Sequence, residues 1–485
     1  MDTSKTFKKS LGLFDSTSLV MGSVIGSGIF IVSSDMARTL GSPGWLMVAW
    51  VITALMTVIA ALSYGELAAM MPQAGGQYVY LREAYNPLAG FLYGWTLFTV
   101  IQTGTIAAVA MAFAKFLGVL FPWFSESNIW LEVGFIKFNT VHFAAIGSIG
   151  LLTWINTRGI KAGKSVQNTF TFSKVGILLA FLVAGLFFAN NRDAMEVNSK
   201  IFWQAARMEN GQLVSLTGFA LIAAIATSMV GSLFSSDAWN NITFAAGEVV
   251  NPKRNIPLSL LIGTATVMIL YFLSNLVYIQ VMPLRGTPDG LTVFERGMQF
   301  ASNDRLGTAS MFGLFGEYAE IIMAMFIVIS TFGCNNGLIL SGARVYYAMA
   351  IHGLFFKQAA VLNSRSVPAF GLITQSVWAS LLCLSGTYGN LLDYVVFAVL
   401  IFYVMTILGI FILRVKRPDA ERPYKAFGYP VIPAIYVIAA TFIMVILLIY
   451  KPMYTWPGLI IVLLGIPVYF LRKKSLGGIK TMEQD

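Results

Sequence analysis

Long apolar stretches recur along the whole chain, and shorter polar connections separate them. A helix that spans a bilayer needs roughly 20 mostly apolar residues, and twelve stretches of this sequence meet or approach that length. They lie near 14–38, 44–70, 88–120, 140–156, 166–189 and 214–247, then near 256–282, 315–350, 369–388, 392–414, 429–450 and 455–472. The pattern predicts an all-α integral membrane protein with twelve transmembrane helices.

Two of these stretches carry breaks where a membrane helix should be continuous. One is 22–30, reading GSVIGSGIF, and the other is 231–241, reading GSLFSSDAWNN. A helix in lipid must satisfy its own backbone hydrogen bonds, so an unwound stretch is tolerated only where it faces protein or a water-filled cavity. Paired breaks in corresponding helices of two halves are a sequence indication of a transporter's substrate site.

The two breaks divide the chain into similar blocks. They lie about 208 residues apart, and each falls in the first helix of a five-helix block. Because five is odd, the second block must insert with opposite orientation, which predicts a 5+5 inverted repeat. The blocks are expected at 14–190 and 214–414, with two further helices at 429–472, an N-terminal segment 1–13 and a tail 473–485.

Composition and charge agree with a membrane protein. Hydrophobic residues make up 57% of the chain and charged residues 11%, whereas soluble chains carry about 25% charged residues. Cys334 and Cys383 fall inside apolar stretches, so a disulfide framework is not expected. The basic N-terminus precedes a long apolar run without a convincing cleavage site, which indicates a retained first helix rather than a signal peptide.

The net charge of +10 is unevenly distributed. With the N-terminus inside, 21 Lys and Arg residues lie towards the cytoplasmic side, 10 lie towards the other side, and Lys174 lies within a span. This asymmetry is the positive-inside rule. It predicts a multi-pass protein of the cell (inner or plasma) membrane with both termini cytoplasmic, and it explains the basic character without a nucleic-acid partner.

The first break is rich in glycine. Gly22, Gly26 and Gly28 remove side chains where extended backbone could approach a ligand. Free amide N–H groups and the positive end of the following half-helix would favour a carboxylate. The alternative is close helix packing, because the spacing from Gly22 to Gly26 is also a small-residue packing motif.

The second break places Ser235, Ser236 and Asp237 within the membrane. An intramembrane carboxylate is costly and is a functional-site hypothesis by default. Asp237 could accept hydrogen bonds from unwound backbone or meet a substrate cation, or it could cap a half-helix that restarts at Ala238. Phe234 could close over a ligand, or simply pack.

Lys174 is expected about nine residues into the fifth helix, roughly 13 Å from its start. A lysine side chain spans about half that length, so snorkelling to the surface is a strained explanation. We expect a buried ammonium that donates to backbone carbonyls freed by a helix break. It could stand in for a bound sodium ion, or carry a proton if burial lets it deprotonate.

The remaining polar groups indicate gating rather than catalysis. Glu66 and Glu248 lie at the cytoplasmic ends of their helices, where we expect them to hold loops through charge pairs. His142 and His352 lack metal-ligand spacing. No nucleophile–base–orienter set is visible, so neither enzymatic chemistry, nor a cofactor, nor a metal site is expected.

Five motifs together identify a family resemblance. They are GSGIF at 26–30, SYGEL followed by PQAGGQYVY within 63–80, GEVVNPKRNIP at 247–257, STFGCNNG at 330–337 and KRPDAERPYK at 416–425. In this order, over nearly the whole chain, they resemble the amino acid–polyamine–organocation superfamily, near its L-type amino acid transporter branch.

The resemblance implies the broken-helix, inverted-repeat fold and alternating access. It places the substrate carboxylate at the first break, on Ile25, Gly26, Ser27, Gly28 and Ile29. It places the substrate amino group at the second break, where Asn240 matches a site asparagine of the family. Ser235, Ser236 and Asp237 of the same break complete the predicted substrate-binding residues. Phe234 matches the gating aromatic of the family. Lys174 matches a lysine that replaces a sodium ion, and would link backbone near Gly22 to Ser330.

Two departures from the L-type branch change what is expected. The connection 121–139 has no cysteine, so no disulfide-linked heavy chain is expected as a partner. Asp237 stands where that branch usually has a small or neutral residue, and resembles the cationic-amino-acid branch instead.

The sequence therefore predicts a sodium-independent secondary transporter of L-amino acids, working as an exchanger or with protons. A cationic amino acid or polyamine antiporter on the same fold is the main alternative. A sodium symporter is less favoured because Lys174 would occupy the ion's place, and a membrane sensor is less favoured because no output domain is apparent.

Overall fold

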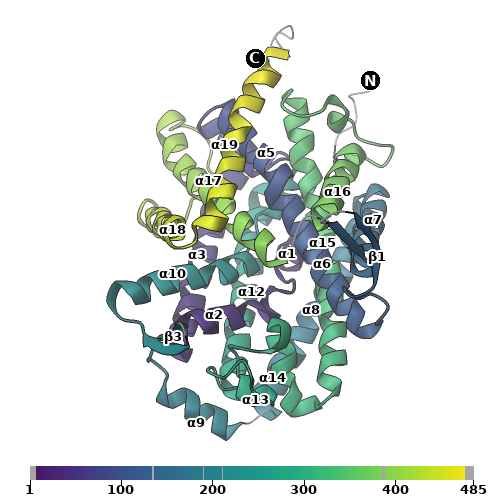
Figure 1. Ribbon diagram of the computed structural model, residues 1–485. Coiled ribbons are helices and arrows are strands. Elements are labelled where there is room, and N and C mark those ends of the chain that lie inside the picture. Colours follow the sequence, from purple (N-terminus) through teal and green to yellow (C-terminus); the bar gives the residue numbers. More distant parts are fainter. Residues whose placement is uncertain (1–6, 134–135, 189–190, 210, 385–387, 476–485) are drawn as a thin grey trace.

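The computed structural model describes residues 7–133, 136–188, 191–209, 211–384 and 388–475 (Figure 1). Within these ranges the regular structure is helical apart from two short antiparallel hairpins. The hairpins are formed by β1 Ile129–Val133 with β2 Ile136–Asn139, and by β3 Ala206–Glu209 with β4 Gln212–Ser215. The all-helical class predicted from the apolar pattern is therefore confirmed.

Most of the long helices coincide with the predicted stretches, and several shorter helices lie in the connections between them. Up to residue 200 they are α1 Leu13–Val24, η1 Gly28–Phe30, α2 Val32–Leu40, α3 Pro43–Met70, α4 Gln77–Ala84, α5 Pro87–Thr96, η2 Leu97–Ile101, α6 Gln102–Leu120, α7 Thr140–Thr157, α8 Ile160–Val183, η3 Ala184–Phe188 and α9 Arg192–Lys200. Beyond it they are α10 Gly218–Ser235, α11 Asn241–Phe244, η4 Ala246–Glu248, α12 Pro252–Val281, α13 Val293–Arg296, η5 Ser302–Asp304, α14 Leu306–Phe315, α15 Tyr318–Ile351, η6 Lys357–Ala360, α16 Ala369–Cys383, α17 Tyr388–Lys416, α18 Val431–Tyr450 and α19 Pro452–Ser475.

Local sequence explains where several long helices begin. Ser42 caps α3 by accepting the Trp45 amide, and Asn86 caps α5 by accepting the Ala89 amide. Proline occupies the first position of α3, α5 and α12. Proline fits that position because the first helical N–H has no partner inside the helix.

Ten helices of the described chain are long and apolar enough to cross a membrane. The predicted span 140–156 coincides with α7, which is not among these ten, and the predicted span 369–388 contains α16, which is only 15 residues long. The count of twelve spans, the inverted repeat and the domain boundaries at 14–190, 214–414 and 429–472 stay predictions. Parts of 1–13 and 473–485 lie outside the described residues.

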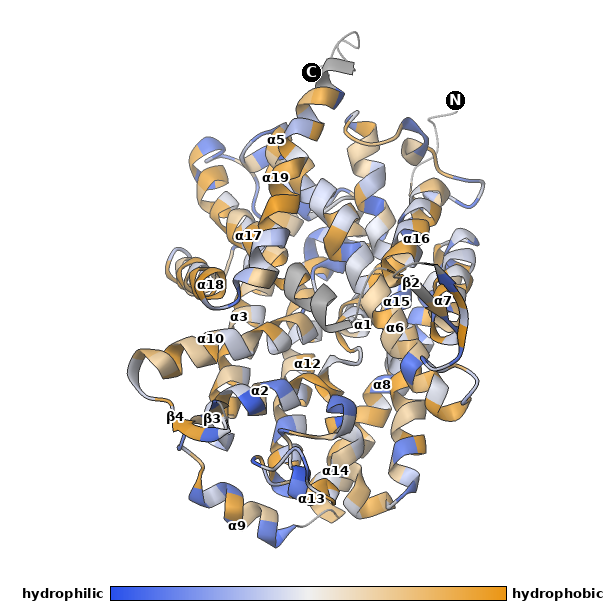
Figure 2. Ribbon diagram, viewed as in Figure 1, coloured by the Kyte–Doolittle hydropathy of each residue, from blue (hydrophilic) through white to orange (hydrophobic). Residues whose placement is uncertain are grey.

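The outer surface of the helices is apolar. Phe172 on α8, Ile438 on α18 and Leu464 on α19 are each more than half exposed. Figure 2 shows hydrophobic residues along the long helices and hydrophilic residues gathered around α13 and in loops at the opposite end. An exposed apolar surface of this size is typical of a protein that contacts another molecule or a membrane. Here the lipid bilayer covers it.

The interior brings both breaks to the middle of the molecule. Helix α1 packs against α8, α12 and α15, while α10 packs against α2 and α3. Both ends of the chain lie at the same end of the molecule, near the top of Figure 1. Long helices therefore pack against both broken helices.

Candidate functional site

The first predicted break is present and is shorter than expected. Helix α1 continues to Val24, Ile25 is extended (φ −72°, ψ 99°), and α2 resumes at Val32 after the 3-10 turn η1. A Cβ atom at Gly28 would lie 2.2 Å from the Ser235 hydroxyl of α10. Glycine is therefore required at this position, because any side chain would push the two breaks apart.

The second predicted break lies between α10 and α11. Residues 236–240 are not helical, and Ala238 adopts a left-handed conformation at φ 66°, which residues with a Cβ seldom adopt. Helix α11 begins at Asn241 with Asn240 as its N-cap. The alternative role of Asp237 as the cap of a helix restarting at Ala238 is therefore wrong.

The two breaks line one cavity of about 330 Å³, which we call the central chamber. Its lining comprises Ser23, Val24, Gly26, Ser27, Gly28, Thr105, Val109, Phe234, Ser235, Asp237, Ala238 and Cys334. Six of the predicted site residues thus meet in one place. The space left between the atoms for a water-sized molecule is only about 20 Å³, so in this conformation the chamber is closed down to the size of about one water molecule.

Four of the predicted site residues are not part of the chamber lining. The backbone carbonyl of Ile25 points to Lys174, and that of Ile29 accepts a hydrogen bond from Tyr278 at 3.1 Å. Ser236 and Asn240 line two further cavities, described below. The backbone turn through Ala238 explains this, because successive side chains of the break point to different sides.

Lys174 lies in the interior, with its side chain 1% exposed. Its ammonium donates to the carbonyl oxygens of Gly22 at 2.5 Å, Ile25 at 2.6 Å and Ser330 at 3.4 Å. The Ser330 hydroxyl donates to the Gly26 carbonyl at 2.9 Å. The expected geometry, a buried ammonium on carbonyls freed by the break, is confirmed.

The helix that carries Lys174 begins earlier than expected. Helix α8 starts at Ile160, so Lys174 lies deeper than the nine residues inferred from the sequence. Gly22 faces this helix so closely that a Cβ atom would lie 1.9 Å from the Gln167 amide and 2.3 Å from the Thr171 hydroxyl. The packing interpretation of Gly22 is therefore correct, alongside its carbonyl contact to Lys174.

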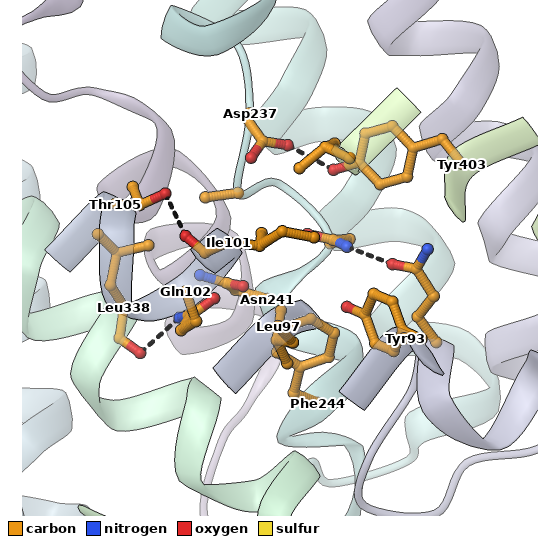
Figure 3. A pocket seen from close by; sticks show the side chains of 14 residues that line it. Tyr93, Leu97, Ile101, Gln102, Thr105, Asp237, Asn241, Phe244, Leu338 and Tyr403 are labelled. Carbon is orange, nitrogen blue, oxygen red and sulfur yellow. Dashed lines mark hydrogen bonds between the residues drawn. The ribbon is translucent and has the colours of Figure 1, made fainter. Parts of the chain in front are cut away.

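Asp237 lies where three cavities meet. Its carboxylate accepts a hydrogen bond from the Tyr403 hydroxyl of α17 at 2.5 Å (Figure 3). Besides the chamber it lines the amide cavity of about 320 Å³, which also contains Gln77, Tyr93, Asn240 and Asn241. It also lines the back cavity of about 380 Å³. The latter is defined by Thr57, Ser236, Tyr403 and Tyr436, together with apolar side chains.

The Asn240 side chain is engaged within the amide cavity. Its amide nitrogen donates to the Gln77 carbonyl oxygen at 2.9 Å, and the Gln77 nitrogen donates to the Thr406 hydroxyl at 3.0 Å. Figure 3 shows Tyr93, Asn241 and Phe244 of the same cavity below Asp237. Asn240 therefore connects the second break to α4 and α17 in this conformation.

Several side chains at the breaks were not predicted. Tyr271 donates to the Val24 carbonyl at 3.2 Å, and the Cys334 thiol donates to the Ser23 carbonyl at 3.0 Å. Tyr403 and Gln77 complete the second break. The sequence signals were the STFGCNNG and PQAGGQYVY motifs for Cys334 and Gln77, whereas the tyrosines are ordinary residues of apolar helices.

Two charge pairs join α3 to α17 and η4 to α15. The Glu66 carboxylate accepts from Arg414 at 3.0 and 2.7 Å and from the Ala426 amide at 2.7 Å. Glu248 and Arg344 form a pair in which both side chains are 1% exposed, at 3.1 and 3.0 Å. The charge pairs predicted for Glu66 and Glu248 are confirmed. Among the described residues, no group of three or more His, Cys, Asp or Glu could hold a metal ion.

Comparison with known proteins finds relatives that are all named as amino acid permeases or transporters. A family model described as amino acid permease matches residues 11–470. The b(0,+)-type amino acid transporter 1 of Mus musculus is 28% identical over 468 residues, covering 96% of this chain and 88% of the relative. The large neutral amino acids transporter small subunit 2 of Homo sapiens is 30% identical over 470 residues, covering 96% and 80%. The Asc-type amino acid transporter 1 of Mus musculus is 27% identical over 474 residues, covering 96% and 81%.

These relatives are transporters and not enzymes, and the match extends over almost the whole chain. The resemblance carried by the five motifs is thereby confirmed. The chain belongs to the amino acid permease family, within the amino acid–polyamine–organocation superfamily and near its L-type amino acid transporter branch.

Proposed function

We propose that this protein is a sodium-independent secondary transporter of L-amino acids across the cell (inner or plasma) membrane. It works by alternating access, as an exchanger or coupled to protons. The relatives are named as amino acid transporters of three types, which supports amino acids as the substrate class. The amino acid and the bilayer are the partners, without a disulfide-linked heavy chain, and both termini are cytoplasmic.

The central chamber suits the carboxylate and the ammonium that all amino acid substrates carry. The unwound segment at Gly26, Ser27 and Gly28 lies beside the start of a half-helix, where amide N–H groups and the helix dipole favour a carboxylate. Across the chamber, the carbonyl end of α10 at Phe234 and Ser235 favours the ammonium. Phe234 would cover the bound substrate.

The observation that carries sodium independence is the position of the Lys174 ammonium. It donates to carbonyls of both the first break and α15 at 2.5 to 3.4 Å. Backbone carbonyls and a serine hydroxyl are oxygen ligands that would suit a small cation in the absence of the lysine. A fixed ammonium holds the break in shape without an ion that has to bind and leave.

Counterflow into proteoliposomes tests the proposal. Vesicles loaded with one unlabelled amino acid are placed in a trace of the same labelled amino acid, and a panel of amino acids is tested in turn. We expect labelled accumulation with at least one amino acid. Accumulation with none of them, by protein that is folded in detergent, would contradict the proposal.

A cationic amino acid or polyamine antiporter is the second candidate, and Asp237 favours it. This carboxylate faces the chamber, and no lysine, arginine or histidine of the described chain lines the three cavities around it. Competition of ornithine, putrescine and leucine against the labelled substrate separates the two candidates. Inhibition by leucine alone would reject the antiporter of cationic substrates.

A further inference from the structure

Asp237 is a buried carboxylate without a matching cation. Its hydrogen bonds come from neutral groups, the Tyr403 hydroxyl at 2.5 Å and the backbone amide of Ala238. Salt bridges are found elsewhere in the described residues, but none involves Asp237. The buried cation Lys174 is engaged with the carbonyls of Gly22 and Ile25 and lines none of the three cavities around Asp237.

Every element packed around this carboxylate presents neutral groups. Helix α3 contributes Tyr64, which contacts the ring of Tyr403 at 5.7 Å, and α5 contributes Tyr93 to the amide cavity. Helix α18 contributes Tyr436 to the back cavity, and α15 contributes Cys334 to the chamber. All are neutral when protonated, so no described side chain compensates the charge.

The cavities beside Asp237 contain polar groups that lack partners. The Ser236 hydroxyl faces the back cavity and is 1% exposed, and it has no hydrogen-bond partner among the described residues. The Asn241 amide nitrogen, which lines the amide cavity, is 1% exposed and equally unpaired within the described chain. Buried polar atoms of this kind normally bind water or a ligand. Two polar cavities, each with room for about one water molecule, therefore adjoin the carboxylate.

A buried ionised carboxylate without a counter-charge is unfavourable, and two species can neutralise it. One is the ammonium or guanidinium of a cationic substrate side chain. The other is a proton on the carboxylate oxygen that does not accept from Tyr403. Either way the cargo has the same total charge. A zwitterionic amino acid that moves with a proton carries +1, and a cationic amino acid that moves without a proton also carries +1.

We propose that Asp237 equalises the charge of the cargo, taking up a proton with each neutral amino acid and pairing directly with the side chain of each cationic one. The inference rests on the proposed amino acid transport and adds a rule about protons to it. The proton joins the carboxylate from water on the entry side and leaves to water on the exit side, so no other reactant is needed. Exchange of a neutral for a cationic amino acid therefore moves one proton with the neutral one and no net charge.

The test uses the full-length protein in proteoliposomes that contain lysine and a pH-sensitive dye. Alanine, serine and leucine are added outside in turn, and labelled lysine efflux and lumenal pH are followed together. We expect the lumen to acidify by about one proton per lysine released, independently of membrane potential. Lysine outside exchanging for lysine inside should leave lumenal pH unchanged.

Substitution of the carboxylate gives the decisive comparison. In Asp237→Asn, lysine transport should fall about thirtyfold or more, because a cationic side chain would enter without its partner. Any remaining exchange of a neutral amino acid for lysine should no longer acidify the lumen, because the proton carrier is gone. Lysine efflux without proton entry in wild type, or lysine transport unaffected by Asp237→Asn, would overturn the proposal.

A second variant keeps the proposal testable if Asp237→Asn does not fold. Tyr403→Phe removes the hydroxyl that stabilises the ionised carboxylate, so acid inhibition of lysine transport should begin at higher pH. Tyr436→Phe removes a hydroxyl from the same back cavity and serves as its matched control. The same pH profile for both variants would contradict the role of Asp237. Labelled flux that is absent for every amino acid would instead reject the proposed function itself.

Discussion

Replacement of Lys174 by alanine tests how the first break is held. The variant removes an ammonium that donates to the Gly22 and Ile25 carbonyls at 2.5 and 2.6 Å, and more weakly to Ser330 at 3.4 Å. A hydrogen bond to a charged group contributes about 1.5–3 kcal/mol, so the two short bonds contribute about 3–6 kcal/mol to the competent geometry. Since about 1.4 kcal/mol is tenfold, transport should fall by a factor of about 100 or more.

The assay is counterflow at matched protein amounts, with size-exclusion profiles and melting temperatures to show that the variant is folded. Lys161→Ala is the matched control, because Lys161 lies on the same helix and is exposed. We expect it to transport like wild type. Wild-type flux in Lys174→Ala would refute the reasoning, and so would equal losses in both variants.

Three further predictions concern the packing of the first break against the second, the buried pair of Glu248 and Arg344, and the effect of pH on stability. Gly28→Val should reduce transport about tenfold or more, because even its Cβ atom would lie 2.2 Å from the Ser235 hydroxyl of the second break. Gly147→Ala is the control, because nothing lies within 4 Å of a Cβ atom at that position, and it should transport normally in the same counterflow assay. Glu248→Gln should lower stability by about 3–5 kcal/mol by leaving the buried Arg344 unpaired, and the double variant with Arg344→Met should recover much of the melting temperature. Burial and a neighbouring guanidinium lower the pKa of His352 to about 4. Between pH 6.5 and 4 the unfolded chain therefore binds a proton at this residue more tightly than the folded protein does. Acidification in that range should lower the melting temperature of the wild type, and should lower that of His352→Gln by less.

The sequence was most informative where a residue type was costly in its setting. Lys174 and Asp237 stand out in apolar stretches, and the partners expected for Lys174, backbone carbonyls of the first break, could be named because the break itself is visible in the glycines. Charge pairs could be expected for Glu66 and Glu248 because both lie at helix ends, but their partners, Arg414 and Arg344, came only from the structure.

Partners brought together only by tertiary structure could not be predicted. Tyr403 is 166 residues from Asp237, and nothing in its apolar helix distinguishes it from a packing residue. The left-handed turn at Ala238 was also invisible, because alanine carries no signal for that conformation. As a result Ser236 and Asn240, which the sequence placed with the substrate, line separate cavities here.

The same reasoning explains which fold statements stay open to test. Apolar length predicts helices well, and most of the long helices coincide with the predicted stretches. It does not decide whether a short or less apolar helix such as α16 or α7 spans the bilayer. Cysteine accessibility scanning with membrane-impermeant reagents on the loops flanking these helices would determine the topology.

The central claim is that Lys174 takes the place of a transported sodium ion, and counterflow in sodium-free buffer tests it most directly. Wild-type protein is reconstituted with the best amino acid of the panel, and sodium is replaced on both sides by choline at equal ionic strength. The account predicts the same initial rate and the same labelled accumulation in both salts. Uptake that disappears without sodium, and is restored by adding it, would contradict the account.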